Sequence, residues 1–174
     1  MGLIGALAAP SGALAATITV NTGADELNTD GDCSLREAIA AANGDVAVDA
    51  CTAGSGADTI EVGATNFVLS RTGSGEDANA TGDLDVATEI TITGTGFVDG
   101  AASDRVLHVA ATGILTITGL TIRNGLAVEE NGGGILNEGT LTLDGVTLIG
   151  NVSLGDDAGA NGGGFGARSS TRGR

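Results

Sequence analysis

The sequence predicts an all-β fold, a parallel β-helix with one short N-terminal helix, and three observations lead to this prediction. Short segments of alternating polar and apolar residues recur at a fixed offset, glycine accounts for 31 of the 174 residues, and only one segment has helical periodicity. Glycine destabilises a helix interior by about 1 kcal/mol relative to alanine. Many short strands joined by glycine-rich turns therefore fit the composition better than a helical bundle does.

The recurring segments are the main evidence for stacked strands. Residues 90–94 (ITITG) match residues 115–119 (LTITG) at an offset of 25, and these match residues 141–145 (LTLDG) at an offset of 26. A second repeat relates residues 131–135 to residues 161–165 at an offset of 30. Repeats of this length are typical of stacked rungs. The predicted columns are Ile90–Leu115–Leu141 and Ile92–Ile117–Leu143 inside, and Thr91–Thr116–Thr142 outside. A β-sandwich with hairpins at this spacing is the alternative fold.

The other elements follow in chain order. Residues 17–20 alternate as a first strand, and an acidic loop over residues 25–32 comes next. Residues 35–42 carry an apolar stripe at helical spacing, which predicts a helix that ends at residues 43–44. The stripe consists of Leu35, Ala38, Ile39 and Ala42. Short strands are expected at residues 58–62 and 67–69, with a longer polar loop at residues 71–83.

Four segments are expected along the chain. Residues 1–15 resemble a signal peptide with a truncated basic start, in which an apolar core precedes a small-x-small cleavage site; a frayed apolar N-terminus is the alternative. Residues 16–57 contain the helix and residues 58–165 the β-helix rungs, while residues 166–174 are expected to form a disordered, non-native-looking tail. No segment after the N-terminus approaches the roughly 20 apolar residues of a membrane span.

The net charge and the cysteine content limit which partners and which cellular compartment are expected. The formal net charge is −15, which disfavours nucleic acid and anionic membrane surfaces as partners, because both are bound mainly by basic residues. Cys33 and Cys51 are the only cysteines. In an exported chain they predict a disulfide, and in a cytosolic chain they would be two buried thiols.

A short segment gives a family resemblance. Residues 32–39 (DCSLREAI) resemble the signature of the CSLREA domain of secreted bacterial β-helix proteins, and the match extends to residues 25–28, 49–51 and 82–85. Residues 132–137 and 150–151 are similar to the repeats of polymorphic outer membrane proteins. The resemblance implies an exported right-handed parallel β-helix of a structural or adhesin-like kind. It supplies no catalytic residue.

One loop has the spacing of a calcium site. Glu26, Asn28, Asp30 and Glu37 follow the ligand positions of an EF-hand loop, with Gly31 at its turn position. Position 1 is Glu instead of Asp, and no helix precedes the loop. Ser34 and Glu37 alternatively form a capping box at the start of the helix, which explains both residues without an ion. Calcium is the one cofactor that the sequence suggests.

The sequence gives less support to the hypothesis that the chain is an enzyme. Asp83 and Asp85 would share one strand face and could form a carboxylate pair, as in polysaccharide lyases or hydrolases. The chain has no Trp, Tyr or Lys, so the usual sugar-stacking residues and a lysine base are missing. We therefore expect solvated carboxylates. His108, the only histidine, is expected to face outward or to sit at a turn.

These observations predict a secreted or surface-displayed structural and adhesive module without catalytic activity. The expected partners are surface glycans or a host or neighbouring cell surface, together with end-to-end self-association through an uncapped Leu141/Leu143 rung. A polysaccharide-acting enzyme with its active site in further downstream sequence, a calcium-binding module and an ice-binding module are the alternatives. The ice-binding reading comes from the threonine columns, but threonine is also a good strand residue.

Overall fold

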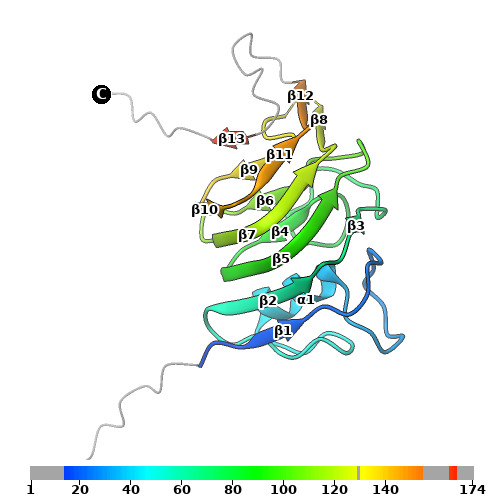
Figure 1. Cartoon of the computed structure of the whole chain (residues 1–174), viewed down its shortest axis with the longest axis vertical. Helices are drawn as coiled ribbons and strands as arrows, with labels where there is room; N and C mark the ends of the chain where they lie inside the picture. The colour runs from blue at the N-terminus through cyan, green and yellow to red at the C-terminus, as the bar shows by residue number, and fades with distance from the viewer. Residues whose placement is uncertain (1–13, 129, 155–164, 168–174) are drawn as a thin grey trace, which may run out of the picture.

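The computed structural model of the chain describes residues 14–128, 130–154 and 165–167. In these residues the chain forms one helix and thirteen strands (Figure 1). The helix is α1 (Leu35–Gly44), and the strands are β1 (Thr17–Thr19), β2 (Asp58–Gly63), β3 (Phe67–Val68), β4 (Leu84–Val86), β5 (Glu89–Asp99), β6 (Leu107–Val109), β7 (Ile114–Arg123), β8 (Leu126–Val128), β9 (Ile135–Asn137), β10 (Thr140–Asp144), β11 (Thr147–Ile149), β12 (Val152–Leu154) and β13 (Phe165–Ala167).

The largest sheet has seven strands, and every strand pair in it is parallel. Its order is β1-β2-β5-β7-β10, with β3 also paired to β5 and β11 to β7. Parallel neighbours need a connection that returns to the same end of the sheet, whereas hairpins give antiparallel neighbours. The strands of the described residues thus form parallel stacks, and the hairpin-built β-sandwich is not the fold that they adopt.

The predicted columns are confirmed by the strand register. Ile90 lies opposite Leu115, and Leu115 lies opposite Leu141. The second column, Ile92, Ile117 and Leu143, is in register in the same way. The column members on β5 and β7 are at most 2% exposed. Leu143, on the outermost strand of the sheet order, is 36% exposed, because β10 has a described neighbour on one side only.

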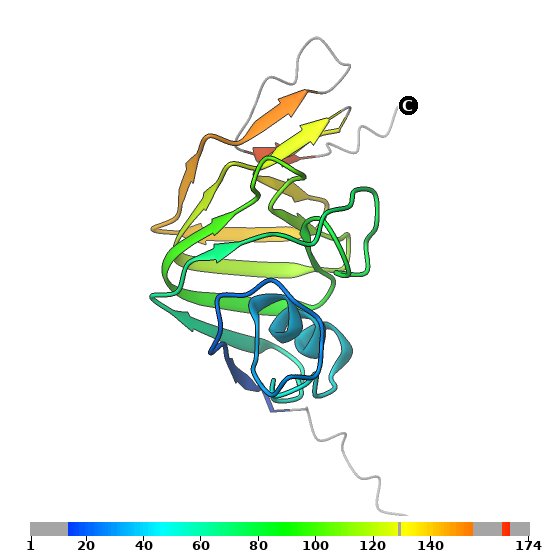
Figure 2. The ribbon, with the colours of Figure 1, turned by 90° about the vertical axis from the view of Figure 1, so that its right-hand side faces the viewer.

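Two smaller sheets complete the strand arrangement. One has the order β13-β9-β6-β4 and the other pairs β12 with β8, again in parallel. Figure 2 shows the chain winding from α1 and β1 at one end of the molecule to β12 and β13 at the other. The buried aliphatic side chains of the two larger sheets belong to one hydrophobic core. Sequence reasoning did not identify β4, β6, β8, β9 or β12.

The second predicted repeat also pairs as expected, but the predicted tail begins too early. Phe165 of β13 lies opposite Ile135 of β9, which matches the 30-residue offset. Strand β13 continues through Ala167, so two residues of the segment expected to be disordered belong to a strand. Residues 168–174 of that tail and residues 1–13 of the expected signal peptide lie outside the described residues.

Helix α1 forms where the apolar stripe predicts it, and its cap accounts for two polar residues of the signature. The amide of Glu37 donates to Ser34 Oγ (3.2 Å), and the amide of Ser34 donates to Glu37 Oε2 (3.0 Å). This is a capping box, in which both residues satisfy amides that the helix leaves without partners. The stripe residues are buried, and the helix ends before Asp45, which has a φ of 50°.

A disulfide joins Cys33 to Cys51, as the two cysteines predicted. It links the residue before the helix cap to the segment after the helix, and both cysteines are buried. Closing a loop of 18 residues constrains the unfolded chain and stabilises the fold by about 3 kcal/mol. The one helix of the described residues has too little length and apolar character to cross a membrane.

Candidate functional site

A polar cluster lies on the outer face of the sheet formed by β4, β6 and β9. Leu84 and Val86 of β4 are buried in the core, so Asp85 between them points to the opposite face. The register places Asp85 beside His108 of β6, and His108 beside Leu136 of β9. An outer face normally meets water, but these three residues are only 2–6% exposed. Another part of the chain therefore covers this face.

The covering segment is the loop of residues 71–82, between β3 and β4. The carboxylate of Glu76 accepts three backbone amide hydrogen bonds from within this loop (2.6–2.9 Å). Burial raises the pKa of Glu76, but these hydrogen bonds outweigh burial and hold that pKa below its usual value. Asn79 fixes the far end of the loop, because its amide donates to Asp85 Oδ2 (2.8 Å) and its side chain donates to the carbonyl of Arg36 (2.8 Å).

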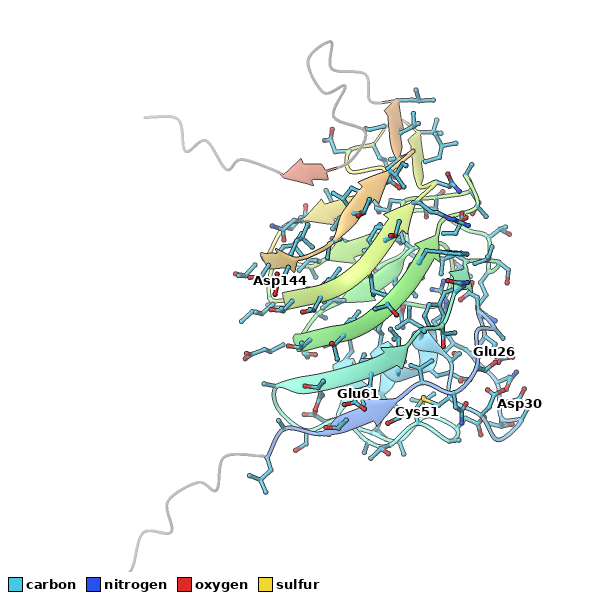
Figure 3. All side chains as sticks on the ribbon, in the orientation of Figure 1. Glu26, Asp30, Cys51, Glu61 and Asp144 are labelled. Carbon is cyan, nitrogen blue, oxygen red and sulfur yellow. A yellow bond between two sulfur atoms is a disulfide. The ribbon has the colours of Figure 1, made fainter. Side chains whose placement is uncertain are left out.

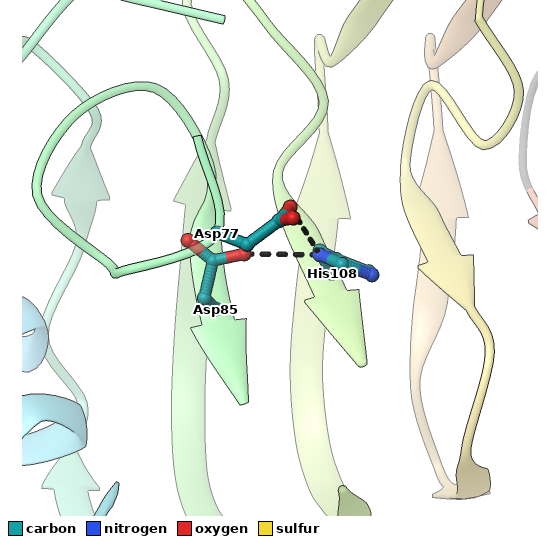
Figure 4. Close-up of side chains that lie close together, drawn as sticks. All are labelled: Asp77, Asp85 and His108. Atoms are coloured by element: carbon teal, nitrogen blue, oxygen red, sulfur yellow. Dashed lines mark hydrogen bonds and ion pairs between the residues drawn. The ribbon is translucent and has the colours of Figure 1, made fainter. Parts of the chain in front are cut away.

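His108 is surrounded by three carboxylates. Its Nδ1 lies 3.0 Å from Asp85 Oδ1 and 3.4 Å from Oδ1 of Asp77, which reaches over from the covering loop (Figure 4). On the other side of the ring, Nε2 lies 3.5 Å from Glu138 Oε2 but forms no hydrogen bond within the described residues. The hydrogen bond with Asp85 raises the pKa of His108, while burial opposes that change.

Arg105 provides the positive charge of the cluster. It forms an ion pair with the buried carboxylate of Asp83 and a second one with Glu130 (2.7 Å). Burial raises the pKa of Asp83 to about 7, although Arg105 favours its ionised form; the nearby carboxylate of Asp85 adds to the increase. Burial likewise raises the pKa of Asp104. Five carboxylates thus lie close to Arg105 or His108 at this face, those of Asp77, Asp83, Asp85, Glu130 and Glu138.

The cluster opens into a cleft of about 270 Å³. Its lining combines Arg105 and His108 with carboxylates from the covering loop and from the segments around β9. The lining residues are Gly75, Asp77, Arg105, His108, Glu130, Asn131, Leu136 and Glu138. A small polar ligand or an ion fits such a cleft better than an apolar molecule does, because charged groups dominate the lining.

One sequence-based expectation is wrong at this site and another is correct in direction. Asp83 and Asp85 were expected to be solvated, but they are 1% and 2% exposed. His108 faces outward, as expected, but the covering loop leaves it only 5% exposed. The apolar-polar-apolar alternation in Leu84-Asp85-Val86 and Leu107-His108-Val109 agrees with their pairing as strands, but three residues in each are too few to have revealed it.

The loop predicted to bind calcium brings three of its four residues together. The Asn28 side chain donates to Glu26 Oε2 (2.8 Å) and Asp30 Oδ2 (3.2 Å). Glu37 is directed toward backbone amides instead: Oε1 accepts from Asn28 (2.9 Å) and Oε2 from Ser34 (3.0 Å). Both oxygens of Glu37 are thus used in holding the loop on the helix.

Asp32, which sequence reasoning did not include, joins this acidic group. Carboxylate oxygens of Glu26, Asp30 and Asp32 lie within 4.8 Å of one another. Partial burial raises the pKa of Glu26 and of Asp32, and the neighbouring carboxylates raise both further. Figure 3 shows Glu26 and Asp30 on the exposed loop at the N-terminal end of the molecule. Oxygens of Asp32, Glu37 and Asp49 form a second group within the same distance, so this region offers two overlapping sets of carboxylate ligands for calcium.

The threonine column is longer than the three repeats predicted. It runs in register across all five strands of the main sheet path, through Thr17, Thr59, Thr91, Thr116 and Thr142. The neighbouring column contains Glu61 and Asp144, two exposed carboxylates that interrupt its threonines (Figure 3). Ice binding by these threonine columns stays a prediction.

Comparison with known proteins finds no matching family model, no matching curated protein and no matching solved structure.

Proposed function

We propose that this chain is a secreted or surface-displayed right-handed parallel β-helix with a structural and adhesive role. The observation that carries the proposal is the continuous parallel register across β1, β2, β5, β7 and β10. Stacked units of this kind contact only their neighbours along the stack, and their surfaces are extended and regular. Such a structure is suited to spacing or presenting contacts outside a cell.

The N-terminal signature supports the same proposal, because its polar residues have roles in the fold. Cys33 forms the disulfide, Ser34 and Glu37 cap the helix, and Arg36 is fully buried against backbone carbonyls. This is what a structural signature of the CSLREA type would require. The disulfide fits an oxidising compartment, since disulfides are rare in the cytosol.

A second copy of the chain is the partner we propose at the C-terminal end of the main sheet. Exposed aliphatic side chains lie on β10 and β11 of this sheet, where Leu143 is 36% and Ile149 58% exposed. Unpaired strand edges with apolar side chains favour stacking on another sheet end. Surface glycans or a neighbouring cell surface are the proposed targets of adhesion.

The experiment combines localisation with binding. Surface protease treatment and fractionation of the producing cells should find the chain outside the cytoplasm with Cys33 and Cys51 joined. Beads coated with the full chain should bind a glycan array or neighbouring cells better than albumin-coated beads. A cytoplasmic location with free thiols, or binding no better than albumin, would contradict the proposal.

Self-association is tested separately by sedimentation velocity over a range of concentrations. Ile149→Asp should reduce association, whereas Val68→Asp on β3 is a matched control, because Val68 is also exposed (49%) but lies away from that sheet end. Equal sedimentation of the wild type and both variants as monomers would refute end-to-end stacking.

A second candidate, a polysaccharide-acting enzyme, is favoured by the cleft. His108 is oriented by Asp85, and Arg105, Glu130 and Glu138 line the same cleft. An oriented imidazole beside carboxylates can transfer protons. The full chain should release reducing ends or unsaturated uronates from a panel of polysaccharides. The His108→Asn variant should lose this activity. Absence of products with the full chain would leave the structural role as the proposal.

A further inference from the structure

The carboxylates around His108 come from separate parts of the chain and converge on one ring. Asp77 belongs to the covering loop, Asp85 to β4, His108 to β6, and Glu138 follows β9. Three carboxylates against one imidazole leave two net negative charges even when the ring is protonated. The Asp85 side chain is only 3% exposed, and a buried negative charge is unfavourable unless a cation or hydrogen bonds compensate it.

The distances match those between ligands of one metal ion. Asp85 Oδ1 and Asp77 Oδ1 lie 3.0 and 3.4 Å from His108 Nδ1, and the three ligand atoms all lie within 4.8 Å of one another. Ligands bonded at about 2.0–2.2 Å in tetrahedral or octahedral geometry are separated by about 3.0–3.4 Å. The three atoms could therefore share one ion after small side-chain rotations.

The far side of the imidazole gives an independent indication. The His108 side chain is 6% exposed, and its buried Nε2 has no hydrogen bond within the described residues, although Glu138 Oε2 is 3.5 Å away. A histidine that binds a metal through one nitrogen almost always donates its other N–H to a carboxylate or carbonyl. Glu138 stands where that acceptor is needed.

We propose that Asp77, Asp85 and His108 bind one divalent transition-metal ion, with His108 coordinating through Nδ1. Glu138 accepts the Nε2 proton and orients the ring. The imidazole favours zinc or a similar first-row ion over calcium, which prefers oxygen ligands alone. Asp77 has a side chain 73% exposed, so the ion can enter from solvent beside the covering loop.

This inference is independent of the proposed function, since an adhesive module and an enzyme could both contain such an ion. It is also separate from the acidic loop of Glu26, Asp30 and Asp32, which has oxygen ligands only. The competing interpretation is a protonated His108 that satisfies the carboxylates without a metal.

The single histidine makes the test direct. The full chain, purified without a histidine tag, is titrated with zinc alone while long-range proton–nitrogen NMR spectra record the one imidazole. Calorimetry under the same conditions gives the affinity, and calcium serves as the contrasting ion. We expect the Nδ1 resonance to respond to zinc at one equivalent and to remain unchanged with calcium.

Asp77→Asn should weaken zinc binding at the imidazole at least tenfold, and Glu138→Gln should weaken it about 10- to 100-fold. Asp144→Asn is the matched control, because Asp144 is exposed on the other sheet and should leave the affinity unchanged. Unfolding curves in chelator verify that the exposed Asp77 substitution leaves the fold intact. An imidazole unaffected by zinc, a response at Nε2 instead of Nδ1, or equal affinities of Asp77→Asn and Asp144→Asn would overturn the proposal.

Discussion

Replacing Arg36 by methionine should strongly destabilise the protein, because Arg36 is buried and its guanidinium has several hydrogen-bond partners. Its guanidinium is fully buried and donates to Asp25 Oδ1 (2.6 Å), to the carbonyl of Gly82 (2.8 Å) and to the carbonyl of Asp83 (2.8 Å). One side chain thus connects helix α1 to the segment before it and to the end of the covering loop.

The magnitude follows from what the substitution leaves behind. Asp25 has a side chain 3% exposed and would be left with only the amides of Ser70 and Arg71 as donors (2.7 and 2.9 Å). Removing one partner of a buried ion pair costs about 3–5 kcal/mol. Two buried carbonyls also lose their donor, so we expect the upper part of that range. Arg36→Lys should recover only part of the loss, because a single ammonium cannot reach acceptors on both sides.

Urea unfolding of the disulfide-bonded protein, followed by circular dichroism, measures the loss. Arg123→Met is the matched control: Arg123 pairs with Asp99 (2.8 Å) and covers the ring of Phe97, but its side chain is 35% exposed. That variant should lose about 1–2 kcal/mol. A loss below about 1 kcal/mol in Arg36→Met, or equal losses in the two variants, would show that the buried contacts of Arg36 contribute little to the stability of the fold.

Three further predictions concern the disulfide, acid stability and calcium. Replacing Cys33 and Cys51 by serine should reduce the free energy of unfolding by about 3 kcal/mol, and an unchanged urea midpoint would contradict this. Burial raises the pKa of Asp99, but hydrogen bonds from an amide and two side chains outweigh it and leave the pKa below its usual value. The ionised form therefore stabilises the fold at neutral pH, and this contribution falls as the pH drops below about 4, so Asp99→Asn should flatten the acid limb of the stability profile. Calcium in tenfold excess over a millimolar affinity should stabilise the wild type by about 1.4 kcal/mol and Glu26→Gln much less, whereas identical melting in chelator and calcium would leave the capping box as the only role of this region.

The long strands and the helix could be predicted because their signals are local and repeated. The alternation in residues 115–119 can be recognised by itself as a strand. Its copies before and after it in the sequence indicate which strands are neighbours. The helix stripe and the Ser34–Glu37 pair likewise lie within one stretch of chain. The disulfide prediction needed the count of cysteines together with the expectation that the chain is exported.

The polar cluster could not be predicted in the same way, because its burial depends on distant parts of the chain. Strands β4 and β6 have three residues each, too few for alternation to stand out. Asp83 and Arg105 are 22 residues apart, and nothing local indicates that they form an ion pair. The calcium ligand set failed to include Asp32 and Asp49 for a related reason: the fold brings their carboxylates beside those of the predicted ligands, and spacing alone does not reveal this proximity.

The signature helix and the cleft are connected through the covering loop. Arg36 donates to carbonyls at the end of that loop, and the loop residue Asn79 returns a hydrogen bond to the carbonyl of Arg36. The amide of Asn79 also donates to Asp85, which holds the ring of His108. A chain of direct contacts thus leads from the buried arginine to the imidazole. Because the loop is what excludes water from the outer face of β4 and β6, losing Arg36 should expose His108 as well as destabilise the helix. The segment that resembles the CSLREA signature therefore also determines whether the outer face of β4 and β6 is exposed to solvent or covered by the loop.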